Sequence, residues 1–172
     1  MVGTDGPAEV AYGWVSREAA TLLLPASGEW CEMVTVAPAF VPASIVRVTG
    51  LGPRYTPVGG ALRASAETVD HLFADDPAGR QAAAMRLVPD DSTSERAVTQ
   101  FGEAERLLWR AAMTWTGPDQ QETGRAVAVA DTSAGLHVIE PDGDGAVLRP
   151  TTPSDVWRLL LLLVPTDHDL LQ

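Results

Sequence analysis

The sequence predicts an α+β fold with antiparallel sheets, in which a three-stranded C-terminal meander packs against a long central helix and a C-terminal apolar helix. Valine-rich runs at residues 126–131, 136–140 and 146–149 are separated by turn residues, which is typical of an antiparallel meander. An unbroken leucine run follows, from Leu159 to Leu163. A helix that is apolar on nearly every side has to be buried, so this run predicts a helix that either forms the centre of the core or leaves one apolar side for a partner.

The first run of the meander has two different faces. Side chains alternate along a strand, so Val127 and Val129 point to one face while Ala126, Ala128 and Ala130 point to the other. The alanine face is smooth, and we expect a helix to pack closely against it.

The C-terminal helix should begin at Pro153. Thr152 is a suitable N-cap, proline favours the first helical position, and Asp155 is placed to reach back to the cap. The body of this helix extends from Val156 to Val164.

The long central helix is predicted over residues 94–115. Ser94 can cap it and Gly117 ends it, and apolar residues recur along it at spacings of three and four. These residues are Ala97, Phe101, Ala104, Leu108, Ala111 and Trp115. Trp109 lies off this stripe, so it either has a second packing partner or is exposed.

Shorter elements precede this helix. We predict a helix from Ser16 to Pro25, and Trp14 ahead of it is interpreted as a core aromatic or as a staple for that helix. Strands are predicted at residues 30–37 and 43–49, although Pro42 could instead begin a helical turn.

The stretch between the second strand and the central helix continues this pattern. Residues 50–60 are rich in glycine and proline, which predicts a loop. Helices are then predicted at residues 60–74 and 77–87.

Length and charge further restrict the domain organisation and the classes of partner that the chain can have. A chain of 172 residues fits a single domain over residues 1–172, and strand blocks at 30–49 and 125–149 hint at an internal duplication. The net charge of −11 argues against binding nucleic acid or an anionic membrane surface. No apolar run is long enough for membrane insertion, and no secretory signal is visible, so we expect a cytoplasmic protein.

Reactive groups are sparse. Cys31 is the only thiol and stands between acidic residues, which blunts a nucleophile. The three histidines lack the spacing of a zinc site, and His137 is interpreted as a hydrogen-bonded or surface residue. We therefore predict no catalytic residue, metal or cofactor, although the question of an enzyme stays open.

Two alternatives to a protein-binding function remain at this point. One is a small-molecule-binding protein or enzyme with a pocket between the meander and the long helix, where Asp70, His71 or His137 would be polar contacts. The other is a homodimeric accessory protein whose apolar helix completes its own interface by self-association.

A family resemblance favours protein binding. The pattern Val127-Ala128-Val129-Ala130-Asp131-Thr132-x-x-Gly135, followed by two further strands, Pro153 and a leucine-rich helix, is similar to the C-terminal part of EspG-type proteins. Those proteins are cytosolic chaperones of actinobacterial type VII (ESX) secretion that bind secreted PE–PPE pairs. Their most specific feature here is the Asp-Thr-x-x-Gly turn between valine-rich strands.

The resemblance implies a non-enzymatic function in which the protein covers the apolar tip of a helical client. A helix or loop of the client would then dock on an apolar groove with a polar rim. The residues that we expect on that partner-binding surface are Trp109, Trp157 and Leu161.

Overall fold

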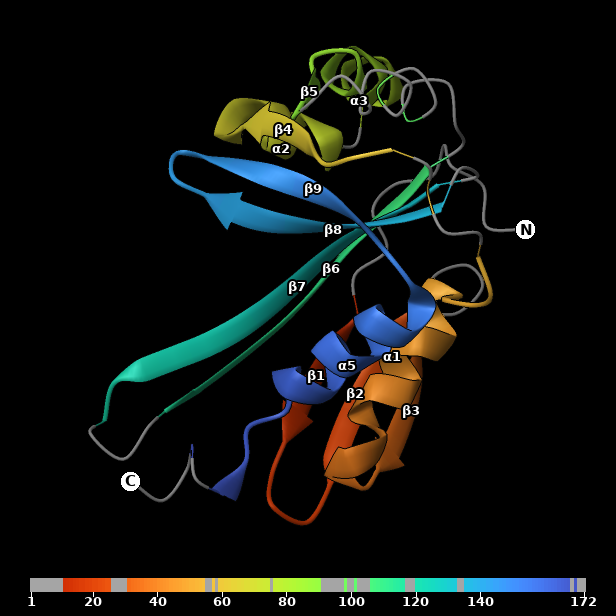
Figure 1. Ribbon diagram of the computed structural model, residues 1–172. Helices are drawn as coiled ribbons and strands as arrows, with labels where there is room; N and C mark the ends of the chain where they lie inside the picture. The colour runs from red at the N-terminus through yellow and green to blue at the C-terminus, as the bar shows by residue number, and fades with distance from the viewer. Residues whose placement is uncertain are drawn as a thin grey trace.

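The computed structural model describes residues 11–25, 31–54, 57, 59–74, 76–90, 98, 101, 106–116, 120–132, 135–167 and 169. Within them the chain is α+β, as predicted, with two antiparallel sheets and several helices (Figure 1). We call the three-stranded sheet sheet A and the six-stranded sheet sheet B.

Sheet A contains three strands in the order β1-β2-β3. The strands are β1 (Tyr12–Val15), β2 (Ala20–Pro25) and β3 (Cys31–Val36). The strand predicted at residues 30–37 is therefore confirmed, whereas the helix predicted from Ser16 to Pro25 is wrong. Ser16 does cap a turn, but this turn joins β1 to β2, and the Ser16 hydroxyl accepts a hydrogen bond from the backbone N–H of Ala19 over 3.1 Å.

After a short 3-10 helix, η1 (Pro38–Phe40), the chain forms α1 (Val41–Thr49). The strand predicted at residues 43–49 is wrong, and the helical alternative starting at Pro42 is correct. Proline in the first turn is pre-organised for a helix, and Gly50 ends it in a left-handed conformation with φ of 64°. These two end signals outweigh the strand preference of the β-branched residues between them.

Sheet B has the strand order β5-β4-β9-β8-β7-β6. Its strands are β4 (Leu62–Ser65), β5 (Val88–Pro89), β6 (Arg106–Thr116), β7 (Glu122–Thr132), β8 (Gly135–Asp142) and β9 (Gly145–Thr151). The predicted C-terminal meander is confirmed as β7, β8 and β9, each antiparallel to its neighbour.

The helical middle of the chain differs from the prediction. Residues 60–74 contain strand β4 followed by α2 (Ala66–Leu72), and the predicted second helix is confirmed as α3 (Pro77–Ala84). The long central helix is wrong over its second half, because residues 106–116 are strand β6, paired along its length with β7. Most of its first half, residues 94–97, 99, 100 and 102–105, lies outside the described residues.

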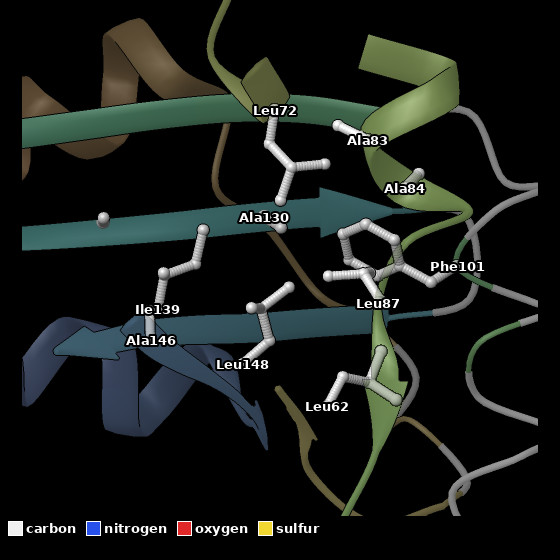
Figure 2. Packing of buried hydrophobic residues seen from close by; sticks show 11 residues of the cluster. Leu62, Leu72, Ala83, Ala84, Leu87, Phe101, Ala130, Ile139, Ala146 and Leu148 are labelled. Atoms are coloured by element: carbon white, nitrogen blue, oxygen red, sulfur yellow. The ribbon is translucent and has the colours of Figure 1, made fainter. Parts of the chain in front are cut away.

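Helices cover both faces of the meander in sheet B. The alanine face of β7 packs against α2 and α3, as expected, and Figure 2 shows Leu72, Ala83 and Ala84 over this face. The valine face packs against α5 (Pro153–Leu163) and residues of α1. Helix α1 also contacts sheet A, since Arg47 forms a 3.2 Å ion pair with Glu32 of β3. Helices α1 and α5 thus connect the two sheets (Figure 1).

Candidate partner-binding surface

Helix α5 begins at the residue that the sequence predicts. The Thr152 hydroxyl accepts a hydrogen bond of 3.2 Å from the backbone N–H of Asp155, and Pro153 lies in the first turn. The same hydroxyl donates a 2.7 Å hydrogen bond to the Asp155 carboxylate. This hydrogen bond, helped by the charge of Arg158, lowers the pKa of Asp155. The start of α5 is therefore fixed by its own sequence.

The end of α5 is held by Arg125 of β7. Its guanidinium donates hydrogen bonds to the backbone carbonyl of Leu162 over 2.9 Å and to the Asp169 carboxylate over 2.6 Å. It also stacks on Trp115 of β6, 5.1 Å from the ring centroid. A cation at the last carbonyls of a helix is favourable, so Arg125 ties the end of α5 to the β6–β7 hairpin.

One side of α5 forms part of the core. Val156, Leu160 and Leu163 are buried against the valine face of sheet B. Full burial of such a side chain contributes about 1.5–3 kcal/mol to stability. The residues that receive them are Trp109, Val127, Val129, Leu136 and Val138.

Trp109 belongs to this core and is absent from the surface that we expected it to form. It lies on β6 in register with Val129, and its indole is buried. Its Nε1 has no hydrogen-bond partner within the described part of the chain. The structure therefore separates Trp109 from the other two predicted residues.

The opposite side of α5 is exposed and apolar. Trp157 is 37% exposed, Leu161 47% and Leu162 63%. Trp157 and Leu161 are one helical turn apart and so lie next to each other on the helix surface. We call these three residues the α5 strip. It contains two of the three residues predicted from the sequence and adds Leu162.

The turn motif that carries the family resemblance has a structural role next to this surface. Asp131 is buried at the end of β7 and accepts two hydrogen bonds from the Arg54 guanidinium, at 2.8 and 2.9 Å. Such a bidentate ion pair fixes the relative orientation of the two side chains as well as pairing their charges. It holds the loop that follows α1 against sheet B.

The other two residues of the motif shape the turn from β7 to β8. The buried Thr132 hydroxyl donates a 2.8 Å hydrogen bond to the backbone carbonyl of Gly135. Gly135 has φ of 125°, a conformation that a residue with a Cβ rarely adopts. The motif is thus explained by backbone geometry and a buried ion pair.

A second exposed apolar surface was missed by the sequence reasoning. Tyr12 is 64% exposed, Trp14 63% and Met33 71%, and all three lie on the same face of sheet A. Trp14 is therefore neither a core aromatic nor a staple. The period-two spacing of Tyr12 and Trp14, which is typical of one face of a strand, was the signal that could have found this face.

The polar groups considered for a ligand pocket do not converge. Asp70 and His71 of α2 are exposed, whereas His137 of β8 is buried. The interpretation of His137 as a hydrogen-bonded or surface residue is wrong for the described chain, because neither ring nitrogen has a hydrogen-bond partner there. Burial lowers the pKa of His137 to about 4, so the ring is neutral at pH 7.

Among the described residues no group of three or more histidine, cysteine or acidic side chains is placed to hold a metal ion. No helix found there has the length and apolar character needed to cross a bilayer.

Comparison with models of protein families, with curated proteins and with solved structures finds no match for this chain.

Proposed function

We propose that this protein is a non-enzymatic, chaperone-like protein that binds a helical client on the α5 strip. The observation that carries the proposal is the exposure of Trp157, Leu161 and Leu162 on a helix whose other side is fully packed. Both ends of that helix are fixed, by Thr152 and by Arg125. A rigid apolar helix face in water is typical of a protein-binding site.

The chemistry of the strip suits an amphipathic helix. Tryptophan is enriched among the residues that dominate binding energy, and the adjacent leucines would exclude water around it. Leu161 and Leu162 are already partly buried, so covering the remainder of each would contribute about 1–2 kcal/mol before the costs of association. Arg158, which is exposed and pairs with Asp155, lies one helical turn from Leu162 and places a charge beside the apolar residues of the strip.

The narrower form of the proposal follows the family resemblance. If the chain acts as EspG-type proteins do, its client is a PE–PPE pair of a type VII secretion system, held in the cytoplasm before export. The support for this form is the sequence resemblance that includes the Asp131-Thr132-x-x-Gly135 motif, whose residues here build the β7–β8 turn and the ion pair with Arg54.

The test is complex formation with defined variants. Trp157→Ala and Leu161→Glu change exposed side chains, so both should fold like wild type while binding to a co-expressed PE–PPE pair falls at least about tenfold. Met85→Glu is the control, because Met85 is an exposed apolar residue at the C-cap of α3, outside the α5 strip. Size-exclusion chromatography coupled to light scattering would measure the complex.

Three results would contradict the proposal or part of it. A complex that survives Trp157→Ala and Leu161→Glu unchanged would remove the α5 strip from the interface. The absence of any complex with PE–PPE pairs would remove the narrower proposal. A stable dimer of the purified chain that Leu161→Glu dissociates would instead assign the strip to a second copy.

A further inference from the structure

Sheets A and B share one arrangement. In each, a three-stranded meander leads into a helix with proline in its first turn: β1, β2 and β3 into α1, and β7, β8 and β9 into α5. The two helices also pack against each other. The two halves of the fold can therefore be compared face by face.

In sheet B both faces of the meander are covered by helices. Helix α5 covers the valine face, while α2, α3 and Phe101 cover the alanine face, as Figure 2 shows. This second layer buries Leu148 and Ile139, which would otherwise lie in water. The meander of sheet B is thus covered by helices on both faces.

In sheet A only one face is covered. Ala20, Leu22 and Leu24 of β2 are buried on the face where Arg47 of α1 meets Glu32. No element within the described residues covers the opposite face, which we call the outer face of sheet A.

The outer face has a regular composition. Tyr12, Leu23 and Met33 lie side by side across the three strands, and Trp14 begins the next row with Thr21 and Thr35. Cys31, which is also exposed, lies at its border. Tyrosine, tryptophan and methionine are the residue types enriched at the centre of protein interfaces.

The area of this face favours a single helix over a second copy of the chain as its binding partner. The longest strand, β2, has 6 residues, so the face measures about 20 Å by 14 Å, or about 300 Å². A stable dimer of two copies requires about 800 Å² on each partner. A single helix about 10–12 Å wide and about 13 residues long fits the face well.

The net charge of the chain also argues against a second copy as the binding partner. The chain carries a net charge of −11, so a second copy would be repelled, and a partner with positive charge beside its apolar stripe would be attracted.

We infer that the outer face of sheet A is a second docking site, and that its occupant is an amphipathic helix of a partner protein whose apolar stripe is flanked by lysine or arginine. The partner helix covers Tyr12, Trp14 and Met33 as α2 and α3 cover the corresponding face of sheet B. This site is separate from the α5 strip and does not depend on it.

The probe for this site is a synthetic 14-residue helix with leucine at positions i, i+3, i+4 and i+7 and lysine elsewhere. Its controls are a scrambled peptide of the same composition and a peptide with glutamate in place of lysine. The full chain carries its own reporters. Cys31 is the only cysteine and is exposed, so its modification by a thiol reagent can be followed, and the exposed Met33 and Met85 can report oxidation by mass spectrometry.

We expect the leucine–lysine helix to slow the reactions of Cys31 and Met33 several-fold and to leave the oxidation of Met85 unchanged. The glutamate peptide should bind more weakly, and the scrambled peptide should give no protection. Trp14→Ser and Met33→Glu, which alter exposed side chains, should each weaken binding about tenfold, whereas Met85→Glu should not.

Several outcomes would overturn the site. The first is that Cys31 and Met33 do not react in the free monomer. The second is protection that appears at low ionic strength with rising protein concentration alone, and the third is equal protection by the scrambled peptide. Peptide binding that Leu161→Glu abolishes and Trp14→Ser leaves intact would place the peptide on the α5 strip. That last result would reject this site while supporting the proposed function.

Discussion

His137 combines two features that make it sensitive to acid. Its side chain is buried on β8, and its ring meets Phe101 edge to face with 5.4 Å between centroids. Both ring nitrogens lack hydrogen-bond partners within the described chain. Protonation would place an unpaired charge in an apolar core, which is strongly unfavourable.

The consequence is a loss of stability between neutral and mildly acidic pH. The pKa of His137 falls from 6.5 to about 4 on folding, so the unfolded chain binds more protons in this window and stability declines as pH drops below 6.5. We expect a loss of about 2–3 kcal/mol between pH 7 and pH 4.5 that His137→Leu abolishes. Urea unfolding of both proteins at the two pH values measures it, and parallel pH profiles would contradict the prediction.

At the scale of elements, the helical pattern over residues 94–115 misled because the sequence of β6 supports both structures. Leucine, arginine, alanine and methionine are good helix formers, which favours a helix locally. The same stretch also alternates, since Leu107, Trp109 and Ala111 face the α5 side together with Met113 and Trp115. Pairing with β7 decides the outcome, and no local signal contains that pairing.

End signals predicted the C-terminal elements of the chain correctly. The start of α5 and the turns of the meander depend on proline, glycine and a capping threonine, whose effects act over a few residues. Helix α1 was predicted as a strand from its β-branched residues, although its proline and Gly50 indicated a helix. Strand β2 had no such signal, and a capped turn at Ser16 resembled a helix start.

Helix α5 provides a test of how much its cap contributes. Thr152→Ala removes the acceptor for the Asp155 backbone N–H and should lower the free energy of unfolding by about 1 kcal/mol. Thr152→Ser keeps the hydroxyl and should retain most of that stability. Chemical denaturation of both variants measures the difference, and an equal loss in the two would assign the effect to the lost methyl group instead.

At the scale of the whole molecule, the sequence identified part of the candidate surface. Trp157 and Leu161 could be named because a helix with leucine on every side cannot bury all of them on one sheet. Trp109 could not be placed correctly while β6 was taken for a helix. The outer face of sheet A was invisible for a related reason: with β2 interpreted as a helix, Trp14 had no sheet to lie on.

The whole molecule combines a large negative charge with two exposed apolar surfaces, and this predicts how self-association depends on salt. At low ionic strength the Debye length is about 30 Å, so the charge of −11 should keep copies apart and the chain monomeric. At 0.5 M salt the repulsion is largely screened, and weak association through the α5 strip and the outer face of sheet A should appear. Light scattering over a concentration series measures it, with Leu162→Glu and Met33→Glu each expected to reduce association at high salt. A dimer that persists at low salt and low protein concentration would show that apolar contact outweighs charge repulsion. It would favour the homodimeric accessory protein over a monomeric chaperone that binds a client.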